Sequence, residues 1–343
     1  MEVEELIRAL PKAEQHIHIV GSTRPATLLW LVDEGGLEAP FGSVEEVEDY
    51  FSYSDFPHFI RVYSTVADSI TEEGQFERLT YEMLEDEARC NVRHVEASFS
   101  APDHTKRGLD YGAMLDAINR GIRRAKWDLG VECSIRIDLV RNYGPAVGME
   151  VLDLIEGKGE NIVSIDIGGS EESFPPGPYA DVYKRARGMG LHTVAHAGEA
   201  AGPESVLEAI TRLDVERIGH GTAASGDSRL EDLIRERGVT LEACPVSNLR
   251  TGVVRSLREH PVRGFFDGGI SVTVNSDDPS MFGTDMNNEY LQLHRHLGFT
   301  VRELFQLSLN AVDSAFLPLE RKTEMRNRFL KEYEDLLDEH EEP

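Results

Sequence analysis

Histidines and carboxylates at the ends of predicted strands are the residues of this sequence whose spacing suggests metal chemistry. His16 and His18 lie two residues apart in a predicted strand, so both side chains point to the same face. The run His196-Ala197-Gly198-Glu199 ends a second predicted strand, and His220 ends a third. Imidazole and carboxylate groups gathered in one place can hold a divalent cation such as zinc and leave a position for water.

A pair of carboxylates follows the last predicted strand in the run Ser276-Asp277-Asp278-Pro279. A single His-x-His pattern is weak evidence, because two polar residues at a strand end need no metal. Four strands ending in His or Asp at one face favour metal-assisted hydrolysis instead. A bound metal lowers the pKa of a water molecule toward neutrality, a nearby His or Asp orients that water and accepts its proton, and Glu199 can protonate the substrate.

The elements that must position these residues follow a simple alternation. Short apolar or β-branched runs recur about every 30 residues, with amphipathic helical patterns between them, and the predicted strands are 14–19, 92–98, 132–139, 162–167, 192–197, 217–219, 240–244 and 270–275. Eight parallel βαβ units favour a closed barrel. The alternative is an open doubly wound sheet, which usually has a glycine-rich phosphate loop after its first strand. Here the first strand ends in His16-Ile17-His18 instead.

We therefore predict an α/β fold, a distorted (β/α)8 TIM barrel that occupies residues 1–343 as a single domain. Two segments are additional to the barrel. A helical insert over about 24–80 follows the first strand and contains an aromatic cluster at 50–56, and a C-terminal helical extension begins near Val301. Insertions after a barrel strand emerge at the face that carries the chemistry, so the insert can cover a pocket.

Composition excludes several classes of partner. Lys plus Arg number 35 against 62 Asp plus Glu, which gives a net charge of −27 and a surface that repels nucleic acid and anionic membranes. The three cysteines, Cys90, Cys133 and Cys244, have no close spacing and are expected to be buried thiols of a reducing compartment. Without an apolar span or an export signal, we expect a cytoplasmic protein that acts on a small molecule. The oligomeric state is left open.

The motifs together resemble the adenosine deaminase branch of the amidohydrolase superfamily. Four motifs occur in the family's order, namely the run Pro11–His18, His-Ala-Gly-Glu, Gly-His-Gly and Ser-Asp-Asp-Pro. The resemblance covers about 6–329. It implies a distorted (β/α)8 barrel with one zinc ion, or another divalent metal such as Fe2+, and hydrolytic deamination at purine C6. The resemblance implies four metal ligands, namely His16, His18, His196 and Asp277.

The resemblance also implies roles for the remaining site residues. Glu199 would protonate purine N1, and His220 with Asp277 would activate and position the water. Asp278 would bond to N7, and the turn at Gly168-Gly169 would offer the Gly169 N–H to N3. The zinc deaminases that use a Cys-x-x-Cys site are excluded, because this sequence has no such motif.

One departure from the family pattern concerns the substrate. Adenosine deaminases read His-x-His-x-Asp-Gly, and that aspartate meets the ribose 5′-hydroxyl, whereas this sequence has Val20. Loss of the acceptor implies a different 5′ substituent. The Val20-Gly21-Ser22 run, with segments 50–59 and 285–290, is similar to the 6-aminodeoxyfutalosine deaminases of menaquinone biosynthesis, whose substrate is an adenine nucleoside with a carboxyphenyl ketone chain at its 5′ end.

We therefore predict hydrolysis of 6-aminodeoxyfutalosine to futalosine and ammonia, with Val20 and the aromatic insert receiving the aryl group. A cation would suit the substrate carboxylate; Arg24 and Arg141 are candidates, although either can be an ordinary surface arginine. The alternative is an adenosine, 5′-modified adenosine or adenine deaminase. A barrel hydrolase with a bridging lysine is disfavoured, because the fourth strand ends in Asp166-Ile167-Gly168-Gly169, and a non-catalytic binding protein is disfavoured because no ligand is lost.

Overall fold

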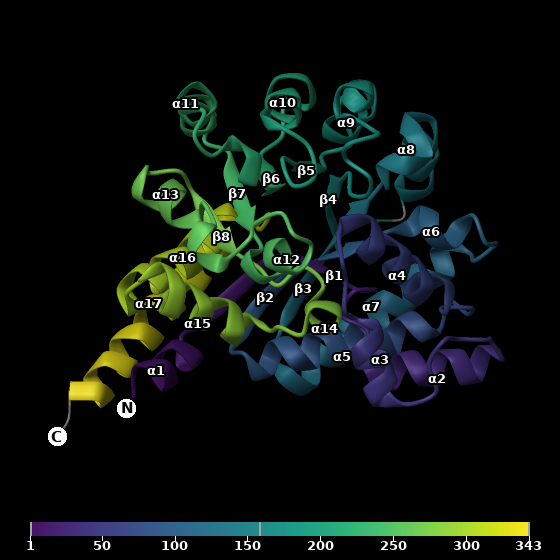
Figure 1. The fold of residues 1–343 in the computed structure, drawn as a ribbon, viewed down its shortest axis with the longest axis horizontal. Coiled ribbons are helices and arrows are strands. Elements are labelled where there is room, and N and C mark those ends of the chain that lie inside the picture. Colours follow the sequence, from purple (N-terminus) through teal and green to yellow (C-terminus); the bar gives the residue numbers. More distant parts are fainter. Residues whose placement is uncertain (1, 158, 342–343) are drawn as a thin grey trace.

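The computed structural model describes residues 2–157 and 159–341, and its centre is a sheet of eight parallel strands (Figure 1). Each strand pairs with the next one in the chain, from Lys12–His18 (β1), Val92–Phe99 (β2), Glu132–Asp138 (β3) and Ile162–Asp166 (β4) to His192–Ala197 (β5), Arg217–His220 (β6), Thr240–Ala243 (β7) and Val272–Val274 (β8). A parallel bridge between Ile17 and Asp277 joins the segment after β8 to β1. The predicted distorted barrel is confirmed.

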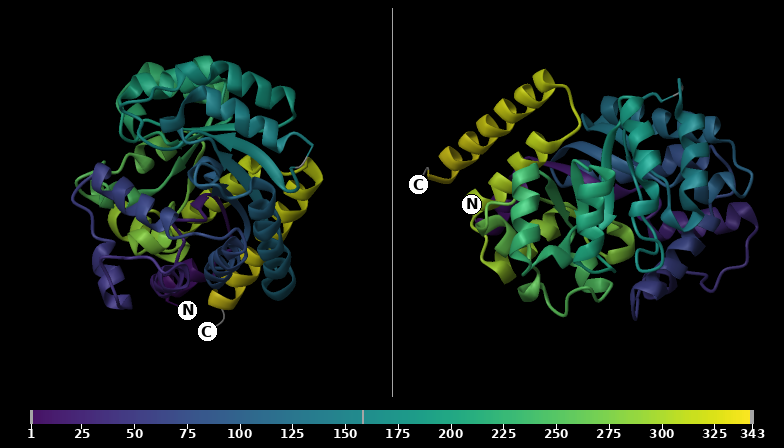
Figure 2. Two further views of the ribbon diagram at one scale, coloured as in Figure 1. Left: turned by 90° about the vertical axis from the view of Figure 1, so that its right-hand side faces the viewer. Right: turned by 90° about the horizontal axis from the view of Figure 1, so that it is seen from above.

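Helices surround the strands on the outside of the barrel (Figures 1 and 2). They are Val3–Ala9 (α1), Pro25–Gly35 (α2), Val44–Tyr50 (α3), Phe56–Asp68 (α4), Gln75–Arg89 (α5), Ala101–Thr105 (α6), Tyr111–Leu129 (α7), Gly144–Ile155 (α8), Ala180–Gly188 (α9), Pro203–Glu208 (α10), Ser228–Arg237 (α11), Pro245–Arg250 (α12), Val262–Asp267 (α13), Pro279–Phe282 (α14), Met286–Leu297 (α15), Val301–Ser314 (α16) and Leu319–Glu341 (α17). Among the described helices, none has both the length and the apolar character that a bilayer crossing requires.

The two predicted additions to the barrel are present as helices. The insert after β1 consists of α2, α3, α4 and the start of α5, and α17 lies at the opposite end of the molecule (Figure 2). Asp55 caps α4 by accepting a hydrogen bond from the His58 N–H, and Pro57 occupies its first turn. Residues 1, 158 and 342–343 lie outside the described part of the chain, so a single domain over 1–343 stays a prediction.

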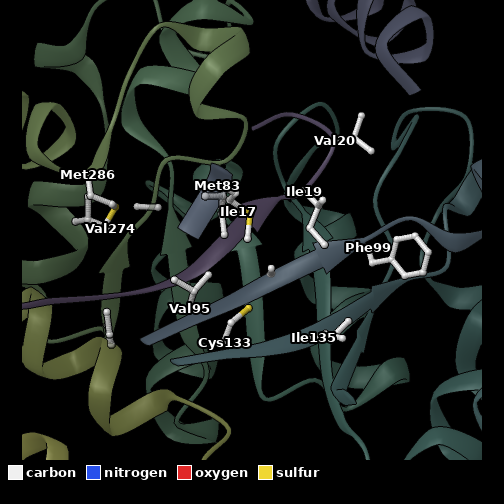
Figure 3. Close-up of a cluster of buried hydrophobic side chains, with 14 of the residues drawn as sticks. Ile17, Ile19, Val20, Met83, Val95, Phe99, Cys133, Ile135, Val274 and Met286 are labelled. Carbon is white, nitrogen blue, oxygen red and sulfur yellow. The ribbon is translucent and has the colours of Figure 1, made fainter. Parts of the chain in front are cut away.

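Side chains of β2 point alternately to an apolar layer outside the barrel and to a polar, charged interior. Val95 and Phe99 point outward into an apolar cluster between the strands and the helices (Figure 3). Glu96 and Ser98 point inward, since Glu96 pairs with Arg217 of β6 and Ser98 accepts a hydrogen bond from Arg136 of β3. The period-two pattern of strand residues therefore places apolar side chains outside the barrel and charged ones inside it.

Candidate active site

The four predicted metal ligands meet at one end of the barrel. His16 and His18 come from β1, His196 from β5 and Asp277 from the segment after β8, and one ligand atom from each lies within 4.8 Å of the others. The Nε2 atoms of His16 and His18 are each 3.3 Å from Oδ1 of Asp277. Nε2 of His16 is buried and has no hydrogen-bond partner among the described residues. An unpartnered imidazole nitrogen beside three further donor groups fits a divalent metal such as zinc.

Buried carboxylates orient two of these imidazoles. Nδ1 of His16 is 2.9 Å from Glu242, and Nδ1 of His196 is 2.9 Å from Asp166. Each carboxylate holds its imidazole by Nδ1 and leaves Nε2 free for a metal. The guanidinium of Arg136 lies between the two carboxylates, 2.7 Å from Glu242 and 3.6 Å from Asp166.

The charges around these carboxylates keep them ionised inside the barrel. Burial opposes ionisation, but the charges of Arg136 and Arg217 outweigh it and lower the pKa of Glu242 to about 2. In the same way, burial is outweighed by His196 and Arg136, which hold the pKa of Asp166 well below its ordinary value. Both groups are therefore carboxylates at neutral pH, each with an oxygen 2.9 Å from an imidazole Nδ1 atom.

Cys244 lies beside the four candidate metal ligands, although the sequence suggested only a buried thiol. His16, His220, Cys244 and Asp277 form a second group whose ligand atoms lie within 4.8 Å of one another. Burial raises the pKa of the Cys244 thiol well above its ordinary value. The set with three imidazoles is favoured, because Asp166 lies 2.9 Å from Nδ1 of His196 and leaves Nε2 of that ring for a metal. The position of Cys244 at the end of the seventh predicted strand was the available signal.

A chain of hydrogen bonds that starts at a backbone amide fixes the tautomer of His220. The Val262 N–H donates to Nδ1 of His260 (3.2 Å), so the proton of His260 is on Nε2 and is donated to Asn248 Oδ1 (3.0 Å). The amide group of Asn248 then donates to Nδ1 of His220 (3.1 Å). Burial lowers the pKa of His260 to about 3 and that of His220 well below its ordinary value, so both rings are neutral. His220 thus presents an Nε2–H donor to the site.

Glu199 lies on the loop after β5, with Oε2 3.5 Å from Nε2 of His220. Burial, and after it the charges of Asp277 and Glu171, raise the pKa of Glu199 well above its ordinary value. The raised pKa favours the protonated form of Glu199, which a proton donor requires. The loop itself is held by Glu171, which accepts hydrogen bonds from the backbone N–H groups of residues 198–201. Sequence reasoning missed Glu171, which follows the Gly168-Gly169 turn by two residues.

Backbone strain occurs at two residues of the candidate site, Asp277 and His220. Asp277 has φ of 67° and His220 has φ of 63°, a region that residues other than glycine seldom adopt. Asp278 is buried against Gly21, where an added Cβ would lie 1.6 Å from Asp278 Oδ1. Only glycine at position 21 therefore leaves room for the Asp278 carboxyl group, which borders the cavity beside Asp277.

A cavity of about 270 Å³ borders the candidate metal ligands His18, His196 and Asp277. One wall comes from α4 and contributes Phe56, Phe59, Ile60 and Tyr63, and the lining also includes Gly168 and Gly169. The Gly169 N–H has no hydrogen-bond partner within the part of the chain that the structure describes. Glu199, His220, Asp277 and Asp278 also line this cavity. Val20 does not, because its side chain is packed into the apolar cluster and is 2% exposed (Figure 3).

The two arginines suggested for the substrate carboxylate are engaged elsewhere. Arg24 pairs with Glu85 and Asp86, at 2.7 Å each. Arg141 is fully buried and donates to the carbonyl oxygens of Phe174, Ile167 and His196, so it is not a surface arginine. Neither side chain lines the cavity, so the suggestion is wrong for both: each guanidinium is already paired with protein acceptors.

Comparison with known proteins identifies the family. The family model of adenosine deaminase matches residues 11–332. The chain belongs to the adenosine deaminase family. It is 40% identical over 319 residues to an aminodeoxyfutalosine deaminase of Streptomyces coelicolor, covering 92% of this chain and 82% of the relative. As a member of this family, the protein is a hydrolytic deaminase that acts on C–N bonds.

Two solved structures of similar proteins share the fold of this deaminase. The adenine deaminase of Arthrobacter aurescens superimposes with a TM-score of 0.91 at 30% identity, covering 96% of this chain and 99% of its own. An amidohydrolase of Burkholderia ambifaria with bound Zn superimposes with a TM-score of 0.90 at 26% identity, covering 98% and 93%.

The central position of Arg136 predicts the behaviour of an Arg136→Met variant. Loss of the guanidinium leaves Glu242 and Asp166 buried with less compensating charge, so we expect a loss of about 3–5 kcal/mol in the free energy of unfolding. The imidazoles would lose their fixed orientation, and zinc affinity would fall about 10–100-fold. Urea unfolding and zinc competition against a chelator measure the two effects.

Arg295→Met is the matched control, because Arg295 forms an exposed pair with Glu4. That variant should keep its zinc affinity and lose far less stability. If Arg136→Met keeps both its stability and its zinc affinity, the guanidinium does not support the site.

Proposed function

We propose that this deaminase hydrolyses the 6-amino group of 6-aminodeoxyfutalosine and releases futalosine and ammonia, a step of menaquinone biosynthesis. The observation that carries the proposal is the cavity, which joins the His and Asp cluster to an aromatic wall supplied by α4. A purine ring at the cluster leaves its 5′ substituent next to aromatic side chains, which suit an aryl group. The name of the Streptomyces relative agrees with this substrate.

The metal of the proposed reaction is zinc, held by His16, His18, His196 and Asp277. Three imidazoles and a carboxylate suit zinc and leave a position for water, and bound Zn in the Burkholderia amidohydrolase supports this choice. When bound, zinc supplies the Lewis acidity that lowers the pKa of a water molecule toward neutrality. Three buried free thiols in the described chain support our further proposal of a cytoplasmic location.

The residues around the cluster then have distinct roles. Oδ1 of Asp277 faces the imidazoles, whereas Oδ2 faces His220, 3.8 Å from its Nε2. Because Nε2 of His220 already carries a proton, His220 orients the attacking water by donating to it, and Asp277 accepts the water's proton. Glu199, protonated, donates to purine N1 and makes C6 more electrophilic as water adds.

The purine is held by contacts on its other two sides. The Asp278 carboxyl group, whose pKa burial raises well above its ordinary value, donates to N7, and the Gly169 N–H donates to N3. N1 is bonded to C6, and N7 is bonded to the neighbouring C5, so both contacts would lie on the side of the purine that faces the candidate metal ligands. At position 20, valine removes the carboxylate that adenosine deaminases direct at the 5′-hydroxyl, and its role near the 5′ end stays a prediction.

The substrate carboxylate would lie at the mouth of the cavity. Among the described residues that line the cavity, none is a lysine or arginine. Lys106 lies nearby, with Nζ 3.6 Å from the centroid of the Tyr143 ring, and Tyr143 borders the cavity. We propose Lys106 as the cation that pairs with this carboxylate in place of Arg24 and Arg141.

Steady-state kinetics with 6-aminodeoxyfutalosine, adenosine and adenine tests the substrate assignment. We expect kcat/KM for 6-aminodeoxyfutalosine to exceed the values for adenosine and adenine by about 10²-fold or more, because these two substrates lack the aryl group that the aromatic wall of α4 would bind. Loss of the aminopurine ultraviolet band measures the rate. A kcat/KM for adenosine comparable to that for 6-aminodeoxyfutalosine would favour adenosine as the substrate. A preference for the free base would favour adenine, which the Arthrobacter structure makes the second candidate.

The acid role of Glu199 predicts the effect of Glu199→Gln. The amide keeps the size and hydrogen bonding of the side chain but supplies no acidic proton, so kcat should fall about 10²–10⁴-fold. Zinc content and the unfolding midpoint should stay unchanged, which separates a lost proton transfer from a damaged site. Turnover near that of the unaltered enzyme would show that another group protonates the purine.

A further inference from the structure

A buried aspartate, Asp138, lines the cavity without belonging to the group of candidate metal ligands, and it has no role in the steps described above. Asp138 ends β3 and is 4% exposed. Its Oδ1 accepts hydrogen bonds from the N–H groups of Val140 (3.0 Å) and Gly168 (2.7 Å). Its Oδ2 accepts from the Ser100 hydroxyl (2.9 Å). A carboxylate accepts about four hydrogen bonds, so three positions are satisfied by protein and one position on Oδ2 is left in a side chain that lines the cavity.

The location of Asp138 relative to the purine follows from the contact at Gly169. In a purine, N3 is bonded to C4, which is bonded to N9, the atom that carries ribose. A nucleoside with N3 at the Gly169 N–H therefore places its ribose beside the Gly168-Gly169 turn. The Gly168 N–H of that turn donates a hydrogen bond to Asp138. We therefore place the remaining acceptor position of Asp138 on the side of the purine that carries the ribose.

We propose that Asp138, with Ser100, binds the 2′,3′-diol of the ribose and makes this deaminase select nucleosides over free bases. This inference rests on the proposed function for the orientation of the purine. Oδ2 of Asp138 accepts a hydrogen bond from one ribose hydroxyl. The Ser100 oxygen, whose proton is donated to Asp138, accepts from the other hydroxyl. Two neighbouring acceptors match the two donors of a cis-diol.

The proposal explains how a cavity in this family can reject adenine. Free adenine has no hydroxyl groups, so it leaves a buried carboxylate with an unfilled acceptor position, and sites built to bind a hydroxyl discriminate strongly against analogues that lack it. The aromatic wall of α4 then receives the 5′ substituent beyond the ribose. Asp138 thus selects for ribose, whereas α4 selects for the group attached to it.

Asp138→Asn separates this role from a purely structural one. The amide oxygen still accepts from Gly168 and Val140, and the amide nitrogen donates to Ser100, so the protein contacts are kept. The group at Oδ2, however, becomes a donor and no longer accepts from a ribose hydroxyl. The substrates are 5′-deoxyadenosine and its 2′,5′- and 3′,5′-dideoxy counterparts, which all lack the 5′-hydroxyl. Asp153→Asn, on the exposed side of α8, is the control.

In the unaltered enzyme, loss of the hydroxyl that contacts Asp138 should lower kcat/KM about 10–100-fold. Asp138→Asn should lower kcat/KM for 5′-deoxyadenosine by a similar factor, chiefly through KM, and change the matching dideoxy substrate less than about threefold. An equal decrease in kcat/KM for all three substrates would mean that Asp138 only supports the turn. The proposal would also be overturned if removal of neither hydroxyl changed kcat/KM of the unaltered enzyme.

Binding of the deaminated products distinguishes failure of this proposal from failure of the proposed function. Calorimetric Kd values for 5′-deoxyinosine and its two dideoxy counterparts require no turnover. If no substrate is deaminated but the Kd ratios follow the expected pattern, the proposed function fails and the diol site stands. If turnover is rapid but neither kinetics nor Kd depends on the hydroxyls, the diol site fails and the proposed function stands.

Discussion

The guanidinium of Arg136 lies fully buried between the carboxylates of Glu242 and Asp166, and the metal site depends on this arrangement. Two carboxylates inside a barrel are costly unless a positive charge compensates them. With that charge in place, each carboxylate can remain ionised and hold one imidazole by its Nδ1 atom. The Nε2 atoms of His16 and His196 are thereby directed to one point before any metal binds.

Closure of the barrel positions Asp277, one of the four candidate ligands, and the space around it. The Asp277 N–H donates to the His16 carbonyl, and the His18 N–H donates to the Asp277 carbonyl, so the first strand and the last segment hold one another. Small residues leave the required room: a Cβ at Gly219 would lie 2.7 Å from Cε1 of His16. The positive φ of Asp277 is thus maintained by the backbone bonds that close the barrel.

The sequence was sufficient to predict the barrel and the meeting of His16, His18, His196 and Asp277 at one end of it, because the carboxyl ends of parallel strands meet at one face whatever the details of packing. It was insufficient for residues whose importance comes from contacts across the barrel. Arg136, Glu171 and Asp138 have no distinctive spacing, and their roles follow from partners many residues away. Arg141 was only a candidate for the substrate carboxylate, and its burial was not foreseen, because a guanidinium bonded to carbonyl oxygens cannot be distinguished by sequence from a surface one.

Zinc K-edge X-ray absorption of the zinc-loaded protein tests the account most directly, because the structure contains two overlapping sets of donor groups. The proposed metal site requires His18 and His196 to be ligands, with His220 free to orient water and Cys244 outside the ligand set. It therefore predicts a first shell of nitrogen and oxygen alone at about 2.0–2.2 Å, with one zinc per chain. A sulfur shell at about 2.3 Å would place the metal on Cys244 and contradict the account.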